Sequence, residues 1–179
     1  IIKTNNFKEI QLHDKRLEII EFFGKTSNFS LYGMDWDNLS NLNETWLSRL
    51  KPIAEKLNPL PCRDKKKTTS RYKFSICLEN IIFPGYVTEK IFDCFNSSVI
   101  PIYMGAPDII DFVPGSTFID LRDFSTNDKL YCYLQNLTEQ KAQQMINDAH
   151  KFLNSKDGKK FSYEFLANKV MNMVDTFEE

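Results

Sequence analysis

Hydrophobic and polar positions follow two periods along this chain. Short apolar runs bounded by polar or glycine residues predict buried strands, at 1–4, 29–32, 72–78, 99–104 and 116–120. Elsewhere apolar residues recur at every third or fourth position, which predicts helices at 14–23, 43–57, 87–96, after 126, at 139–153 and at 161–177. Asp14, Asn43 and Thr126 stand at the starts of three of these helices and are the predicted N-caps.

Two helices and one loop carry predictions about burial. The helix at 87–96 gathers its apolar positions on one face, which we expect to point inward: Val87, Ile91, Cys94 and Phe95. The last helix has an apolar stripe that we also predict to be core: Phe165, Val170, Met173, Val174 and Phe177. Residues 58–69 contain two prolines and three consecutive lysines and are predicted to form a solvated loop.

Strands that alternate with helices, and that are apolar along their length, indicate an α/β fold. We predict a Rossmann-like parallel sheet with helices on both faces. In such sheets ligands bind beyond the carboxyl ends of the strands. The turns at that edge are 5–6, 33–37, 79–86 and 104–107. We therefore expect a binding site where these turns converge.

Composition narrows the class of protein. The 179 residues are the size of one domain, and 42% of them are hydrophobic, which is enough to build a core. A formal net charge of −1 disfavours a nucleic-acid binder, which is normally basic. Six scattered glycines build neither a Walker loop nor a dinucleotide-binding glycine turn. Four cysteines without a Cys-x-x-Cys spacing, together with two histidines, argue against a structural zinc site.

The same composition leaves the compartment open. Four cysteines fit either redox state, and no apolar run approaches the ~20 residues of a membrane span, so no membrane tether is visible. Asn-x-Ser/Thr sequons favour a secretory origin without establishing one; they begin at Asn28, Asn38, Asn43, Asn96 and Asn136.

The segment 78–90, LENIIFPGYVTEK, carries the candidate chemistry. A strand brings Glu79 and Asn80 to the edge of the sheet, and a turn follows. Glu89 and Lys90 then occupy the first turn of the next helix. The free amides and the positive dipole end of that helix, with the charge of Lys90, suit a phosphate group.

Two further side chains extend this site toward a nucleoside diphosphate. Glu89 can accept two hydroxyl protons, as an acid does for a nucleotide ribose. Tyr86 offers an aromatic face and a hydroxyl group. The alternative is that Glu89 only complements the helix dipole and that Lys90 is solvated; spacing alone does not decide between the two.

Several linked motifs follow one another from Tyr72 to Phe124. The chain reads YKFSICLEN, a short loop, YVTEK, then IPIYMG and FIDLRDF. Their order and spacing resemble the donor-binding core of the α-1,3/4-fucosyltransferases. Leu78 stands where that family usually has phenylalanine. Upstream, LYGMDW is similar to the family's Tyr-Gly-x-Gly-Trp turn, which Met34 and Asp35 alter.

The resemblance implies the C-terminal half of a GT-B glycosyltransferase, which binds GDP-fucose as donor. By motif match, Asn80, Tyr86, Glu89 and Lys90 are the implied donor contacts, with Glu89 on the ribose and Lys90 on the diphosphate. The family also has an arginine near the phosphates. Arg16 is the candidate for it by position only.

The resemblance further implies an inverting fucosyltransferase. It would move L-fucose from GDP-fucose to a hydroxyl of an N-acetylglucosamine-containing glycan, with no obligatory metal or other cofactor. In the family the general base belongs to an N-terminal acceptor domain. We therefore expect residues 1–179 to form one donor-binding domain, incomplete for catalysis until a further domain or a partner subunit supplies the acceptor half.

Alternatives to this interpretation stay open. The chain could instead be a non-catalytic nucleotide-sugar-binding module, or part of a GT-B glycosyltransferase that uses a different nucleotide sugar. Asp35 and Asp37 also form an Asp-x-Asp pair of the kind that holds a metal, although the metal-free interpretation is favoured. A full-length eukaryotic enzyme of this family would work in the Golgi lumen, and a bacterial or viral one in the cytoplasm or at the membrane periphery.

Overall fold

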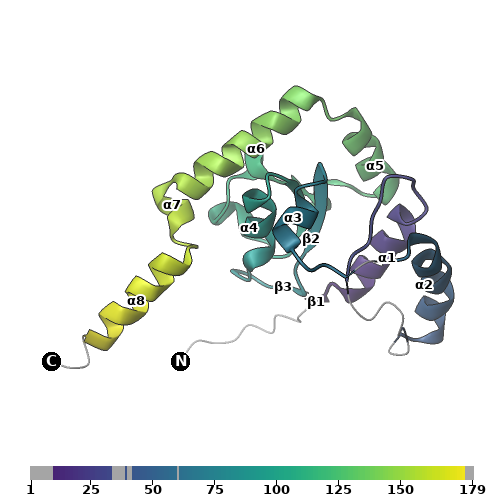
Figure 1. Cartoon of the computed structure of the whole chain (residues 1–179), viewed down its shortest axis with the longest axis horizontal. Coiled ribbons are helices and arrows are strands. Elements are labelled where there is room, and N and C mark those ends of the chain that lie inside the picture. Colours follow the sequence, from purple (N-terminus) through teal and green to yellow (C-terminus); the bar gives the residue numbers. More distant parts are fainter. Residues whose placement is uncertain (1–9, 34–38, 40–41, 60, 176–179) are drawn as a thin grey trace.

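A parallel sheet lies at the centre of the molecule. The computed structural model in Figure 1 describes residues 10–33, 39, 42–59 and 61–175. Three parallel strands form the sheet, in the order β2 (Phe74–Leu78), β4 (Ile100–Met104) and β5 (Ile119–Asp120). The register places Ile76 opposite Ile102, and Ile102 opposite Ile119. The strands predicted at 72–78 and 99–104 are confirmed, and so is the parallel arrangement of the sheet. Of the strand predicted at 116–120 only Ile119–Asp120 forms, because Gly115–Thr117 is a turn of 3-10 helix.

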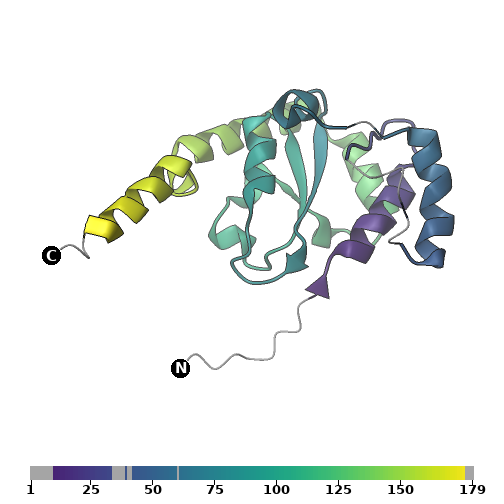
Figure 2. The same cartoon turned by 60° about the horizontal axis from the view of Figure 1, so that its bottom comes forward.

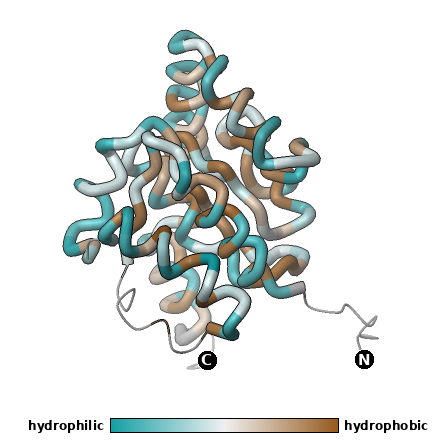
Figure 3. The backbone as a smooth tube through the Cα atoms, turned by 90° about the vertical axis from the view of Figure 1, so that its right-hand side faces the viewer, coloured by the Kyte–Doolittle hydropathy of each residue, from teal (hydrophilic) through white to brown (hydrophobic). Residues whose placement is uncertain are grey.

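Helices cover both faces of the sheet, as predicted. One face packs against α4 (Glu89–Asn96) and the end of α6 (Glu139–Asn154), through Cys77, Ile91, Cys94, Phe95, Tyr103 and Phe152. The other face packs against α1 (His13–Phe23) and α5 (Asn127–Asn136), through Ile19, Phe23, Leu78, Ile100, Ile102 and Leu130. Figure 2 shows the strands between these two layers. Figure 3 shows hydrophobic and hydrophilic positions alternating along the backbone.

The helix α4 is the crossover between two neighbouring parallel strands. Its predicted inward face is confirmed: Ile91, Cys94 and Phe95 are buried, and Val87 packs against them just before the helix. A crossover helix must lie against the sheet that its two strands belong to. The connection therefore holds the first turn of α4 at the carboxyl edge of the sheet, beside the end of β2.

The cap predictions had mixed outcomes. Asn43 caps α2 (Glu44–Leu57) by accepting from the Trp46 N–H, and Thr126 caps α5 in the same way. Asp14 was wrong as a cap, because α1 already begins at His13, after Leu12, whose side chain makes no capping bond. Asp14 instead lies in the first turn, where its charge complements the helix dipole.

Two segments between α1 and β2 differ from prediction. The lysine run belongs to a short helix, α3 (Lys65–Thr69), because the Asp64 side chain accepts from the Lys67 N–H and so starts a helical turn. The strand predicted at 29–32 is reduced to a single bridge at Tyr32. Phe29 and Leu31 are held there by packing against α1 and α2. The strand predicted at 1–4 lies outside the described residues.

The last helix contradicts its prediction as core. After α7 (Lys156–Lys159), α8 (Tyr163–Asp175) extends away from the sheet (Figure 1). Phe165, Val170 and Met173 are 43%, 50% and 55% exposed. The side chains of Val174 and Phe177 lie outside the described part of the chain. Among the described residues, no helix is long and apolar enough to cross a membrane.

Candidate functional site

The turn between β2 and α4 is anchored on two sides. Within it, β3 (Ile81–Ile82) pairs antiparallel with β1 (Ile10–Gln11), and the Leu12 N–H donates to the Asn80 carbonyl at 2.9 Å. Gly85, at φ 72°, has a backbone conformation that favours glycine, and its N–H donates to Asp108 Oδ1 at 2.9 Å. These hydrogen bonds hold the backbone of the turn in one conformation, and so fix the positions from which its side chains project.

At the end of β2, Glu79 points into the interior and is 0% exposed. Its Oε1 accepts from the Thr88 backbone N–H at 2.9 Å. Its Oε2 accepts from the Thr88 hydroxyl at 2.7 Å and from the Lys90 ammonium at 3.0 Å. A buried carboxylate is stable only when it is paired and hydrogen-bonded, and Glu79 is both. The sequence pattern placed Glu79 at this edge but gave it no role, because spacing does not distinguish a buried acid from an exposed one.

The first turn of α4 presents one cation and one anion. Lys90 keeps 26% of its side chain exposed, and its ammonium also donates to the Thr88 hydroxyl at 3.0 Å. Glu89 is exposed. A hydrogen bond from its own backbone N–H lowers the pKa of the Glu89 carboxyl, and the nearby charges of Lys90 and Lys65 lower it further. Glu89 is therefore an ionised acceptor at neutral pH.

A second cation reaches the same place from α1. The Arg16 guanidinium donates through Nη2 to the carbonyl oxygens of Leu78, at 3.3 Å, and Glu79, at 3.4 Å. Arg16 and Lys90 thus converge on one residue, Arg16 on its backbone and Lys90 on its side chain. This juxtaposition could not be predicted from the sequence, which is silent on how close α1 lies to the end of β2.

The remaining predicted residues lie along the turn. Asn80 directly follows Glu79 and is exposed. Tyr86 is half-buried at the other end of the turn, where its N–H donates to the Phe83 carbonyl at 3.1 Å. The structure brings Arg16, Glu89 and Lys90 to the ends of β2 and α4, with Asn80 beside them. Tyr86 approaches from the far side of the turn.

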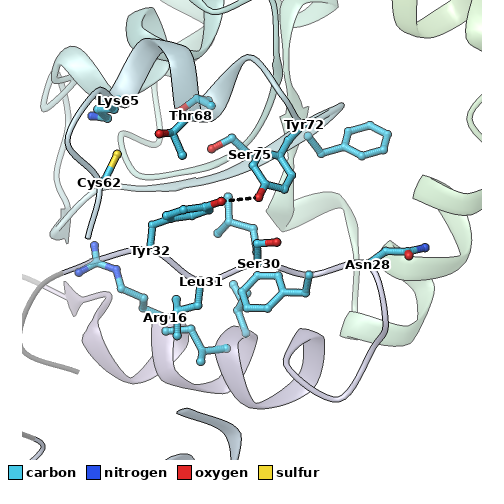
Figure 4. A pocket seen from close by; sticks show the side chains of 16 residues that line it. Arg16, Asn28, Ser30, Leu31, Tyr32, Cys62, Lys65, Thr68, Tyr72 and Ser75 are labelled. Atoms are coloured by element: carbon cyan, nitrogen blue, oxygen red, sulfur yellow. Dashed lines mark hydrogen bonds between the residues drawn. The ribbon is translucent and has the colours of Figure 1, made fainter. Parts of the chain in front are cut away.

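A cavity of about 520 Å³ lies next to this site (Figure 4). Its walls come from α1, the segment 28–32, α3 and β2. Across it the hydroxyls of Tyr32 and Tyr72 are 2.7 Å apart, and this hydrogen bond raises the pKa of Tyr32. Arg16 lines the cavity, whereas the predicted donor contacts on the turn and on α4 do not. The cavity and the site therefore meet at Arg16.

Metal-binding side chains do not gather in the part of the chain that the structure describes. No three His, Cys, Asp or Glu side chains there are arranged to hold a metal ion. Asp35 and Asp37, the alternative metal pair, lie outside the described residues, as does Met34. Leu78, the departure from the family motif, is buried against the α1 face of the sheet.

Comparison with known families decides the relationship. Residues 8–152 match the C-terminal domain of glycosyltransferase family 10, the fucosyltransferases. The chain belongs to this family. The matched interval contains Arg16 and the whole of the turn and helix from Glu79 to Lys90, and it ends before α8.

Two relatives compared by sequence agree with this assignment, and one solved structure is similar over part of its length. An α-(1,3)-fucosyltransferase of Helicobacter pylori is 39% identical over 119 residues, which are 65% of this chain and 25% of that protein. An α-(1,4)-fucosyltransferase of Arabidopsis thaliana is 41% identical over 68 residues, 38% of this chain and 17% of that protein. A crystal structure of an α1,3-fucosyltransferase with GDP is 32% identical, with a TM-score of 0.45, and the match covers 49% of this chain and 26% of that one. The chain thus spans about a quarter or less of the length of these family members.

Proposed function

We propose that this chain is the GDP-fucose-binding, C-terminal domain of an inverting fucosyltransferase with the GT-B architecture. One observation carries the proposal: within the interval that matches the family, Arg16 and Lys90 converge on Glu79, at the carboxyl edge of a parallel sheet and beside the start of α4. Two cations beside a helix N-terminus suit a diphosphate. Family membership supports fucose as the sugar, and the resemblance of the segment 78–90 to the family's donor-binding motif implies GDP as its carrier.

Each residue of the site has a part in holding the donor. Lys90, Arg16 and the free amides of α4 would stabilise the charge on the diphosphate, which grows as GDP departs. Glu89, ionised and exposed, would accept hydrogen bonds from the ribose hydroxyls. Asn80 and Tyr86 would contact the donor from the turn. These side chains need no metal or other cofactor to neutralise the leaving group.

The transfer needs an acceptor hydroxyl, which we propose is on an N-acetylglucosamine-containing glycan. Its oxygen bonds to the anomeric carbon of fucose while the bond from that carbon to the diphosphate breaks. A carboxylate takes the hydroxyl proton, and GDP carries away the electron pair. Glu79 is committed to Thr88 and Lys90. As the family resemblance implies, we place the base on an N-terminal domain or a partner subunit, and we expect this chain alone to bind GDP-fucose with little or no transfer.

Thermal-shift titrations test the donor. A ligand at 100 times its Kd stabilises a protein by about 2.7 kcal/mol, or roughly 5–10 °C at this size. We expect this shift with GDP and GDP-fucose and little shift with UDP. GDP-mannose, which differs from GDP-fucose in its sugar, should give a smaller shift than GDP-fucose. Lys90→Ala and Glu89→Ala should lose the shift. Lys151→Ala, a change at an exposed lysine on α6, should keep it.

The titrations also separate the alternatives. Equal shifts with UDP and GDP would overturn guanosine nucleotides as ligands and favour another nucleotide sugar. Tight GDP-fucose binding without transfer, even after the acceptor half is supplied, would favour a binding module over an enzyme. A flat response to every nucleotide would overturn the donor site itself.

A further inference from the structure

Glu79 is a fully buried carboxylate for which the proposed function has no direct use. We propose that Glu79 is a positioning residue: it fixes the Lys90 ammonium and the start of α4 in the place where the diphosphate binds. This inference rests on the proposed function, which assigns the diphosphate to Lys90. Glu79 itself does not touch the donor, because its side chain is 0% exposed.

The hydrogen bonds of Glu79 are arranged for such a role. Thr88 is the residue before α4, and its N–H and hydroxyl both donate to the Glu79 carboxylate, at 2.9 and 2.7 Å. Lys90 donates to Glu79 Oε2 and to Thr88 Oγ1, each at 3.0 Å. An ammonium has three N–H donors, so these bonds leave one for a ligand at the exposed side. The long lysine side chain is thereby held in one geometry.

The surrounding chain is built closely around this carboxylate. At Gly105, after β4, a Cβ atom would lie 2.4 Å from Glu79 Cγ and 2.5 Å from the Tyr103 hydroxyl. The Tyr103 hydroxyl is itself fixed, because it accepts from the Ala106 N–H at 3.0 Å. Arg16 meanwhile donates to the Glu79 carbonyl oxygen. Three separate segments therefore close on Glu79, and both cations of the site depend on its position.

Electrostatics alone predicts the opposite effect from positioning. Glu79 places a negative charge 3.0 Å from the lysine that would bind phosphate. Removing that charge raises the positive potential at the site, which should strengthen the binding of an anion. If Glu79 acts by holding Lys90, removing its charge should instead weaken the binding of phosphate groups. The sign of the change therefore distinguishes the two roles.

The main test compares GDP with guanosine on Glu79→Gln, a neutral substitution of nearly the same shape. We expect the Kd for GDP, measured by calorimetry on the full chain, to rise about tenfold, as for loss of one charge-assisted hydrogen bond. Guanosine lacks the phosphates, so its Kd should stay unchanged. A Kd for GDP that falls or does not change would overturn the proposal. Asp93→Asn is the control: Asp93 lies on α4, as Lys90 does, and the change breaks its exposed pair with Lys65 of α3, which should leave both constants unchanged.

Thr88→Val covers the case in which Glu79→Gln does not fold. It removes the hydroxyl that links Glu79 to Lys90 and keeps a β-branched side chain before α4. The expected result is a several-fold weaker binding of GDP with guanosine binding retained. Unchanged GDP binding by a folded Thr88→Val protein, or equal weakening of both ligands, would overturn the proposal.

A measurement without ligand separates this inference from the proposed function. In protein labelled with ¹⁵N-lysine, a held ammonium exchanges its protons slowly and gives a sharp NMR signal. We expect such a signal from Lys90, assigned by its loss in Lys90→Ala, and its broadening in Glu79→Gln. Absence of the signal from the unmodified chain would overturn the positioning role. A sharp signal in a chain that does not bind GDP would overturn the proposed function alone.

Discussion

The helices α4 and α8 have similar sequence patterns and opposite surroundings. Both carry apolar residues at helical spacing. On α4, Ile91 and Phe95 are 0% and 1% exposed, whereas on α8 Val170 and Met173 are 50% and 55% exposed. The difference lies in what the chain does next. One parallel strand of the sheet comes directly before α4 and another directly after it, so α4 must lie on that sheet. Within the described residues, α8 follows β5 and does not connect two strands. The periodicity of apolar residues identifies a helix face that can be buried, and the connections of the helix to the strands decide whether a sheet packs against that face.

The largest effect on stability should come from a cavity under the buried helix, α4. Ile91→Ala leaves a void between α4 and the sheet, and we expect a loss of about 2–5 kcal/mol in the free energy of unfolding, measured with urea. Val170→Ala on α8 is the matched change on the exposed side and should alter stability by about 0.5 kcal/mol or less. A loss at Val170 that rivals the loss at Ile91 would mean that α8 is covered in solution.

The second prediction adds an atom instead of removing some. Gly105→Ala places a Cβ against Glu79 and Tyr103, as described above, and overpacking of this kind costs about 1–3 kcal/mol. Gly115→Ala is the control, because a Cβ there has nothing within 4 Å, and its stability should match the unmodified chain within about 0.5 kcal/mol. Equal urea midpoints for the two variants would show that the packing around Glu79 is looser than the structure indicates.

The comparison also explains how far the sequence predicts this fold. The strands β2 and β4 and the helix between them could be predicted from their apolar runs, because these three elements follow one another in the sequence and also pack against one another. The helix α3 was missed, because one capping residue, Asp64, starts it within a lysine run that has no apolar stripe. The pair of β1 and β3 was missed because each strand has only two residues, and their pairing depends on contacts distant in sequence.

The candidate site divides in the same way. The place of Glu89 and Lys90 at a helix start can be predicted, because a motif and a helix start coincide in the thirteen residues of the segment 78–90. Arg16 is 62 residues from Leu78, whose carbonyl it contacts. Only its position in the sequence suggested it as a donor contact. Glu79 was assigned no role, because its burial arises from Gly105 and Thr88 closing around it. Side chains whose function depends on tertiary packing are the ones that a sequence pattern misses.

A helix cap on α2 should give a smaller effect. Asn43 accepts from the Trp46 N–H at 2.9 Å and so satisfies a donor that the helix leaves open. We expect Asn43→Ala to lower the free energy of unfolding by about 1 kcal/mol. Asn96→Ala, at the exposed C-terminal end of α4, removes an asparagine that caps no helix start, and it should change stability by about 0.5 kcal/mol or less. Equal losses would mean that the cap of α2 contributes nothing specific.

The smallest effect on stability should come from the ion pair of Glu21 and Arg49, which is less buried than Glu79. Glu21 on α1 accepts from Arg49 on α2, and this bond lowers the pKa of the Glu21 carboxyl, with Lys25 lowering it further. Because the folded-state pKa lies below the unfolded one, the pair stabilises the fold at neutral pH and loses its effect as the pH falls below about 4. Arg49 also lies over the Trp46 ring at 4.2 Å, a contact that low pH leaves intact. Urea midpoints should therefore differ slightly between the unmodified chain and Glu21→Gln at pH 7 and approach each other as the pH is lowered to 3. A gap that stays constant between the two pH values would show that Glu21 acts through its shape and not through its charge.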